Sequence, residues 1–153
     1  MTLARRARTA ACVLRMLPGY VAVAALKHFV PVTTIARWLA REPHPRVDPD
    51  LVDRISGASR RIRRMSPIGD RDCLQRSLVL FRQLPRAGLK PSLAMGFRRV
   101  DGRLEGHAWI VVDDRPFDEP VMPGSPFEET CRIGADGRVL TGQRDAAPAG
   151  ARS

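Results

Sequence analysis

Three residues of this 153-residue chain have the types and the order that nucleophilic catalysis needs. Cys73 opens an apolar run with helical spacing, His107 lies in a run patterned as a strand, and Asp118 follows a short acidic turn. A cysteine attacks carbonyl groups as a thiolate, which a nearby imidazole and a helix N-terminus both favour. A carboxylate can then hold the imidazole in the required tautomer. These residues predict a thiol protease or a thiol acyltransferase with Cys73, His107 and Asp118 as its catalytic residues.

The expected helix places the Cys73 thiol in its first turn. Gly69 interrupts the preceding segment, and either Asp70 or Asp72 can cap the helix. The N–H groups and the dipole of a first turn favour a negatively charged sulfur. Pro85 cannot continue a helix, so we expect the helix to end just before it.

A short turn predicts the strand that carries the histidine. Asp101-Gly102 suits a two-residue hairpin turn, and this turn pairs His107 with Gly96 on the preceding strand. The glycine either leaves room above the imidazole or marks a bulge in the strand.

A second turn, at Asp113-Asp114, sets Asp118 opposite Trp109 and so on the sheet face of His107. Trp109 could roof the site, but we expect it to fill the core. Glu119 would point to the other face, although a bulge or a slip of one residue would exchange the two carboxylates. We therefore predict that Asp118 orients His107, with Glu119 as the alternative.

Each of the three residues also has a structural interpretation. A single cysteine is often a small buried hydrophobe, a role that Cys12 and Cys131 fit. A histidine in a half-buried strand is often structural, and an aspartate after a hairpin often belongs to the turn. The combination favours catalysis, because without a catalytic role the three residue types would have to occur on the required helix and strands, in the required order, by chance.

The segments around these residues resemble those of a known family. Residues 72–78 contain Cys-Leu-x-Arg-Ser, residues 106–110 contain His-Ala-Trp, and residues 115–118 read Arg-Pro-Phe-Asp. Together they resemble the transglutaminase-like family found in lasso-peptide gene clusters, the microcin-processing leader peptidases. The resemblance covers about a third of the chain, and the chain length suits the stand-alone form without a fused precursor-binding domain.

That resemblance implies an α+β fold of the papain-like or transglutaminase-like kind, with N-terminal helices packed on a small antiparallel sheet. It implies removal of the leader from a ribosomally made lasso-peptide precursor by a Cys-His-Asp triad. The implied partners are the precursor peptide, a small precursor-recognition protein and a lasso cyclase. The family commonly has an Asn-Asp pair after the hairpin, where this chain has Asp118-Glu119. An amide-forming acyltransferase and a non-catalytic peptide-binding module remain open as alternatives.

Composition fits a single enzyme domain in a reducing compartment. The chain is long enough to bury one core without disulfides, and its 44% apolar content is ordinary. Its three cysteines have no CxxC spacing, which disfavours a secreted disulfide framework and favours the cytoplasm. The three histidines lack metal-ligand spacing, and no Gly-rich loop suits a nucleotide. We therefore expect no metal and no cofactor.

The net charge of +10 invites a nucleic-acid interpretation, which other features disfavour. Four arginines lie within residues 60–64, but the chain has one tyrosine and no interleaved aromatic platform for stacking bases. An acidic peptide or the acidic face of a partner explains the charge better.

The N-terminal apolar run, residues 17–30, is not expected to cross a membrane. It contains Pro18-Gly19 and carries Lys27 and His28, whereas a span needs about twenty apolar residues. No clear signal-peptide cleavage site follows it. We predict helices over residues 3–17, 20–29 and 32–41 instead, with contact to a membrane surface as the alternative.

The rest of the chain is divided by a Pro-rich linker, residues 42–49. Residues 1–47 form a helical segment of the same domain, and residues 48–141 form the catalytic core. In that core, Asp48 or Asp50 can cap a helix that ends near Met65, and Asp136-Gly137 predicts a further hairpin. Residues 142–153 contain little to bury and are predicted to be disordered.

Overall fold

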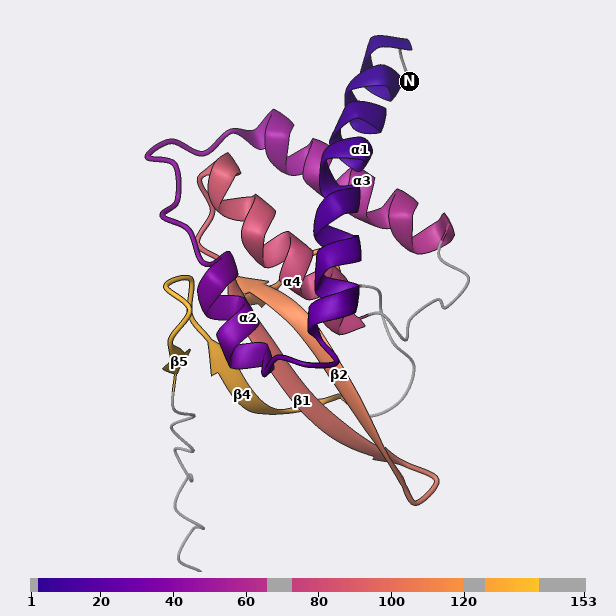
Figure 1. Ribbon diagram of the computed structural model, residues 1–153, viewed down its shortest axis with the longest axis vertical. Helices are drawn as coiled ribbons and strands as arrows, with labels where there is room; N and C mark the ends of the chain where they lie inside the picture. Colours follow the sequence, from indigo (N-terminus) through magenta and orange to yellow (C-terminus); the bar gives the residue numbers. More distant parts are fainter. Residues whose placement is uncertain (1–2, 66–72, 120–125, 141–153) are drawn as a thin grey trace, which may run out of the picture.

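A central helix lies between an outer group of helices and an antiparallel sheet in the computed structural model (Figure 1), which describes residues 3–65, 73–119 and 126–140. This helix, α4 (Cys73–Gln83), is buried at every position from 75 to 81. It contacts three other helices, α1 (Leu3–Leu26), α2 (Val32–Leu39) and α3 (Pro49–Met65). Its other side packs on the sheet. The expected α+β architecture, with helices packed on a small antiparallel sheet, is confirmed.

The sheet has five strands in the order β3-β2-β1-β4-β5, and every neighbouring pair is antiparallel. The strands are β1 (Ser92–Val100), β2 (Arg103–Val112), β3 (Arg115–Pro116), β4 (Glu128–Ile133) and β5 (Val139–Leu140). The last two confirm the predicted third hairpin.

Both hairpin turns that position the site are as predicted. Asp101 and Gly102 have φ angles of 48° and 76°, and Asp113 and Asp114 have φ angles of 48° and 57°. A two-residue turn with positive φ at both positions matches the twist of the flanking strands. The predicted registers follow, because Gly96 pairs with His107 across the first turn. Across the second turn, Val112 pairs with Arg115.

Gly96 lies at an irregularity in the pairing of β1 with β4. The register of that pair shifts between Met95 and Gly96. A Cβ atom added to Gly96 would lie 2.2 Å from the backbone oxygen of Glu128. The missing side chain therefore makes room for the bulged backbone of β4, which is the second of the two roles expected for this glycine.

The predicted break at Pro18-Gly19 is wrong, because α1 runs through both residues as one helix of 24 residues. A proline inside a helix removes one hydrogen bond and costs about 3 kcal/mol. On either side of it, Met16, Tyr20 and Val23 recur at helical spacing and join the core. Their packing against α3 and α4 outweighs the local preference of the proline.

The unbroken α1 removes one reason for expecting that the chain does not cross a membrane. Its segment Ala7–Leu26 is 20 residues long, has a mean hydropathy of 1.6 and is only 17% buried, so its length and composition would allow it to cross a bilayer. The apolar segment is therefore neither too short nor interrupted, contrary to the sequence prediction. That the chain has no span stays a prediction.

The ends of the other helices follow local signals. The Asp48 side chain accepts a hydrogen bond from the N–H of Leu51 at 3.0 Å, so Asp48 is the cap of α3 that the sequence offered. After α4 the chain forms a short 3₁₀ helix, η2 (Leu84–Ala87), and Gly88 follows with φ 82°. A Cβ at Gly88 would lie 2.4 Å from the backbone oxygen of Arg46. The end of α4 and the linker before α3 are thereby held together.

One core joins the helices to the sheet. Buried residues of α1, α3, α4 and the strands form a single cluster that includes Met16, Ile55, Leu78 and Ile110. The predicted boundaries at 47/48 and 141/142 stay predictions. The possible caps Asp70 and Asp72 and the predicted disordered tail lie outside the described residues.

We expect Gly96→Ala to destabilise the protein by about 1–3 kcal/mol, because the new Cβ must displace the backbone of β4. Gly57→Ala, in helix α3, is the matched control. Its new Cβ would lie 3.8 Å from the Thr9 side chain, which is an ordinary van der Waals distance. The control should be neutral or stabilise by up to about 1 kcal/mol. Urea unfolding measures both free energies. Equal midpoints for the two variants would contradict the role assigned to Gly96.

Candidate active site

The Cys73 thiol lies at the first residue of α4, as predicted. It is hydrogen-bonded to the His107 side chain and to the backbone of Leu74 and Ala108. A sulfur at the start of a helix faces N–H groups that have no partner within the helix. The structure thus brings Cys73 and His107 together, and their catalytic roles stay a prediction.

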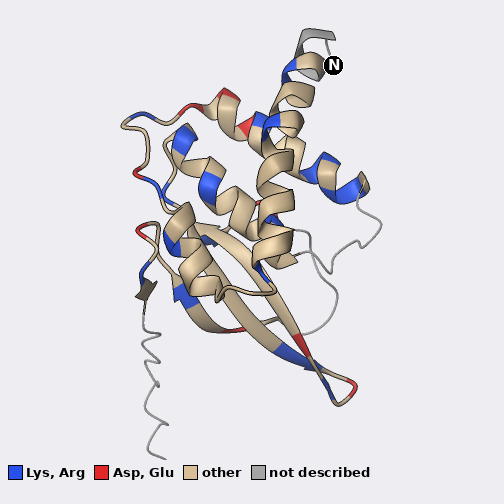
Figure 2. Cartoon of the chain, in the orientation of Figure 1, with Lys and Arg blue, Asp and Glu red and all other residues tan. Residues whose placement is uncertain are grey.

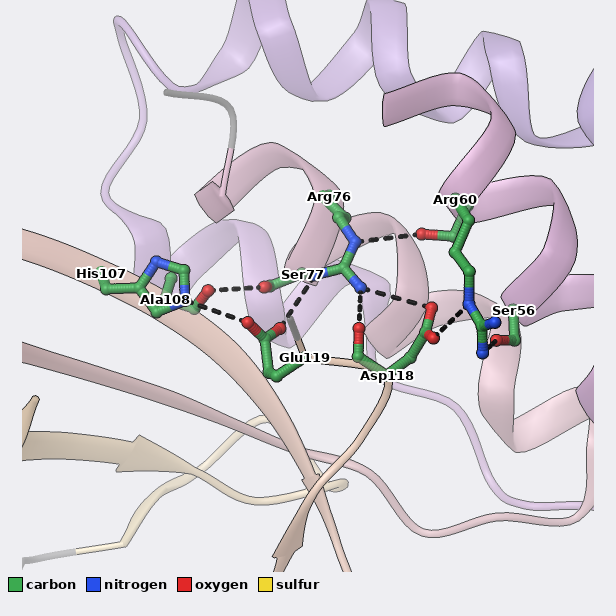
Figure 3. Close-up of polar contacts among 9 residues, drawn as sticks. Ser56, Arg60, Arg76, Ser77, His107, Ala108, Asp118 and Glu119 are labelled. Carbon is green, nitrogen blue, oxygen red and sulfur yellow. Dashed lines mark hydrogen bonds and ion pairs between the residues drawn. The ribbon is translucent and has the colours of Figure 1, made fainter. Parts of the chain in front are cut away.

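The imidazole of His107 lies between this thiol and a carboxylate. Its Nε2 is 3.1 Å from Oε2 of Glu119 (Figure 3), which leaves Nδ1 for the thiol. A ring held at both nitrogens has a fixed orientation. The thiol, imidazole and carboxylate therefore form a continuous hydrogen-bonded chain.

The carboxylate in this chain is Glu119, and the expected placement of Asp118 beside His107 is wrong. The hairpin register was correct, and the backbone N–H of Phe117 still bonds the Ile110 oxygen at 2.8 Å. The strand β3 ends before Asp118, which adopts φ 53°. A residue in the left-handed region breaks the alternation of side chains along a strand. The Asp118 side chain therefore turns towards the helices, and Glu119 takes the position beside His107.

Arg76 holds this turn in place. Its Nη1 donates to Glu119 Oε1 at 2.8 Å, and its Nη2 donates to the backbone oxygen and a carboxylate oxygen of Asp118. Its Nε donates to Ser59 Oγ at 3.2 Å. The Arg76 side chain is 8% exposed, so this is a buried, fully engaged guanidinium. It lies one helical turn after Cys73 and joins α4 to the carboxylate that contacts His107.

The Asp118 carboxylate extends this network to α3. It pairs with Arg60, whose Nη2 also donates to Ser56 Oγ at 3.0 Å (Figure 3). Asp118 is 6% exposed and therefore needs the two arginines to compensate its burial. Its contacts support the turn, while those of Glu119 reach the imidazole.

Ser77 fixes the distance between the two elements that carry Cys73 and His107. Its hydroxyl donates to the backbone oxygen of Ala108 at 3.0 Å, and both residues are buried. This bond ties α4 to β2 next to His107. Cys73 and His107 therefore lie on packed elements, whereas Glu119 lies in the loop after β3 and is held there by Arg76.

The electrostatics of the site favour an ion pair. Burial alone would raise the pKa of the Cys73 thiol, but its hydrogen bonds to His107, Ala108 and Leu74 and the charge of His107 outweigh burial and lower it. Burial would lower the pKa of His107, but hydrogen bonds and charges from Cys73 and Glu119 raise it to about 9. Thiolate and imidazolium therefore coexist over a range of pH that ends near 9.

The other cysteines have different surroundings. Cys12 on α1 is half-buried, and burial raises the pKa of its thiol despite the nearby arginines. Cys131 lies on β4 opposite Met95. All three cysteines are free, and Cys73 alone is hydrogen-bonded to an imidazole among the described residues. Within this part of the chain, no group of three His, Cys, Asp or Glu residues could hold a metal ion.

Aromatic rings cover the other side of His107. Trp109 stacks with the imidazole at 5.8 Å between ring centres, and Phe127 lies 4.9 Å from it. The guanidinium of Arg98 lies over Phe127 at 4.5 Å. Trp109 is only partly buried and packs against the imidazole, so the expectation that it fills the core is wrong.

Sequence reasoning did not assign a role to Arg76, Ser77 or Ser59. A signal for the first two was present, because Arg76 and Ser77 interrupt an otherwise apolar stretch on a helix expected to be buried. For Ser59 the sequence carried no such signal, since its partner comes from another helix.

One family comparison matches most of the chain. The sequence model of the transglutaminase-like superfamily matches residues 13–132, which include all the residues of the network. The chain belongs to the transglutaminase-like superfamily. Searches of curated proteins and of solved structures find no significant match. This superfamily includes cysteine peptidases and acyltransferases.

We expect Glu119→Gln to weaken the ion pair of this transglutaminase-like site. Removing the carboxylate charge should lower the pKa of His107 from about 9, and the smaller imidazolium population should raise the pKa of Cys73. As pH falls, alkylation of Cys73 by iodoacetamide should therefore slow at a higher pH in the variant than in the wild type. NMR titration of the His107 ring measures the first shift, and alkylation rates measure the second.

Asp118→Asn is the matched control, because Asp118 does not contact His107 in the structure. It should leave the pH dependence of alkylation close to that of the wild type. A large shift in this variant with none in Glu119→Gln would show that the contacts of the two carboxylates are exchanged in solution.

Proposed function

We propose that this protein is a cysteine peptidase that removes the leader from a ribosomally made lasso-peptide precursor. The observation that carries the proposal is the hydrogen-bonded chain from Cys73 through His107 to Glu119, which has the polarity that acyl transfer by a thiol requires. The finer assignment to leader removal rests on the Cys-Leu-x-Arg-Ser and His-Ala-Trp patterns. Membership of the superfamily supports the chemistry more broadly.

In the proposed reaction the Cys73 thiolate attacks the carbonyl carbon at the end of the leader. The backbone N–H of Cys73 is the candidate donor to the oxyanion, because it lies at the helix start. His107 gives its proton to the leaving nitrogen as the peptide C–N bond breaks, and the leader stays bound as a thioester. His107 then takes a proton from water, whose oxygen attacks the thioester and releases the leader with a free carboxylate.

Glu119 is the proposed orienting residue of this reaction, and Arg76 is a positioning residue that acts through it. Glu119 accepts from the imidazole through one oxygen and from Arg76 through the other, so its rotamer is determined by the buried guanidinium. Asp118 supports the turn that presents Glu119, because its carboxylate and its carbonyl both bind Arg76. The third residue of the proposed triad is thus Glu119 instead of Asp118.

The charge of the surface supports an acidic substrate segment or partner. A hollow of about 510 Å³ lies between α1 and α3, and its charged lining consists of Arg60, Arg61 and Arg64 with one acidic residue, Asp53. Arg60 also pairs with Asp118, so the hollow adjoins the network of the site. An acidic leader, or a small recognition protein that presents it, would find complementary charge there.

We expect Cys73→Ala to abolish release of the leader, while Cys12→Ala and Cys131→Ala stay close to wild type. Glu119→Gln should lower kcat about 100-fold or more, since the imidazole loses its orienting partner. Asp118→Asn should have a smaller effect, because the carbonyl contact to Arg76 remains. Mass spectrometry of precursor digests measures these rates.

The same experiment separates the peptidase from an amide-forming acyltransferase. A leader that ends in a free carboxylate supports the peptidase, whereas a leader joined to an added amine supports the acyltransferase. Release of leader by Cys73→Ala at the wild-type rate would contradict both, whereas absence of any product with the wild-type chain would favour a non-catalytic module.

We further expect a recognition protein to accelerate leader release. Because its docking would raise the local concentration of substrate, the acceleration should decrease with added salt if the contact is electrostatic. Arg61→Gln combined with Arg64→Gln should reduce the acceleration. The control is Arg99→Gln combined with Arg103→Gln, which removes two charges from the first hairpin. Equal rates with and without the recognition protein would show that the chain recognises its precursor unaided.

A further inference from the structure

The outward face of α1 is an apolar stripe. Leu14, Leu17 and Val21 are 68%, 41% and 70% exposed, and their spacing of three and four residues places them on one side of the helix. Of the exposed residues between 7 and 25, only Arg8 and Arg15 are polar. These two lie seven residues apart and therefore flank the stripe along one edge.

Packing in the hydrophobic core does not account for the apolar residues of this stripe. The opposite face of α1 supplies Met16, Tyr20 and Val23 to the core, so the helix is an integral part of the fold. The family match also begins within it, at residue 13. A helix that is apolar on both faces is normally covered on both, either by protein or by lipid. Within the described residues, only the inner face of α1 is covered.

The charges on α1 have one sign. The helix α1 contains no acidic residue and is mostly uncharged along its length (Figure 2). Arg15 of α1 lies close enough to Arg86 to interact with it electrostatically. Arg41 and Arg82 also interact electrostatically with Arg86. Burial lowers the pKa of Arg86, and these three neighbouring cations lower it further. Arg15, at the edge of the stripe, thus belongs to a group of four neighbouring guanidinium groups, and a phosphate-rich layer would compensate their charge.

Aromatic side chains are exposed at the C-terminal end of α1. Phe29 follows the helix and is 89% exposed, and Trp38 of α2 is 59% exposed. Large aromatic rings favour the boundary between water and lipid.

We propose that α1 binds the surface of an anionic lipid bilayer, with Leu14, Leu17 and Val21 in the acyl boundary and the arginines against the headgroup phosphates. The helix lies in the plane of the surface, because its inner face is committed to α3 and α4 and cannot also face lipid. A bilayer needs no shape complementarity, and it combines the apolar layer and the negative charge that this face matches. This binding is independent of the leader-peptidase function.

The test is sedimentation of the full chain with vesicles. We expect binding to vesicles of phosphatidylcholine with phosphatidylglycerol, weaker binding to phosphatidylcholine alone, and loss of binding with added salt. Leu14→Gln combined with Val21→Gln should weaken binding about tenfold or more, since it removes the apolar contact. The control is Leu104→Gln combined with Val139→Gln, which alters residues that are 63% and 52% exposed on the sheet. This control should bind as the wild type does.

Circular dichroism would reveal whether the first pair of substitutions prevents folding. In that case a second variant, Arg8→Gln combined with Arg15→Gln, still tests the proposal. It should reduce binding to the anionic vesicles only. Absence of binding to both vesicles, or equal binding by the stripe variant and its control, would overturn the proposal. So would a dimer in light scattering that the stripe variant abolishes, since a second copy would then cover the face. Resistance to carbonate extraction would overturn the in-plane arrangement in favour of a span.

Discussion

The buried guanidinium of Arg76 is the interaction on which the geometry of the site depends. It binds Ser59 on α3, the turn at Asp118 and the side chain of Glu119, so four hydrogen bonds join three parts of the fold. A cation in this position would be costly without such partners, and each carboxylate would be costly without the cation. The network therefore forms as a unit, and its outcome is a carboxylate presented to His107 at a defined distance.

The location of the site on packed elements makes that geometry rigid. The helix α4 is surrounded by other elements, and Ser77 ties it to β2 beside His107. Thiol and imidazole are thus placed by the same contacts that stabilise the core. In this half-buried environment the hydrogen bonds and charges overcome desolvation in both groups, lowering the pKa of Cys73 and raising that of His107. The ion pair is a product of the fold and not of any single residue.

Different surfaces of the helical layer have different characters. The hollow beside α3 is lined by arginines and adjoins the network of the site. The outer face of α1 is apolar, with arginines along its edge. A peptide substrate and a lipid surface would therefore be bound by separate parts of the protein. Such a division would allow the proposed peptidase to work at the proposed membrane surface without obstruction of its site.

Features with local causes could be predicted from the amino-acid sequence alone. Turn residues that tolerate positive φ fixed both hairpin registers, and they paired Gly96 with His107. The order of residues placed Cys73 at a helix start. The identity of the carboxylate that reaches the imidazole depends on long-range contacts, because Asp118 leaves the strand conformation to bind arginines from two helices. Such contacts likewise carry α1 through Pro18, since packing on α3 and α4 outweighs a local preference. Contacts between distant segments have no signal in any one of them.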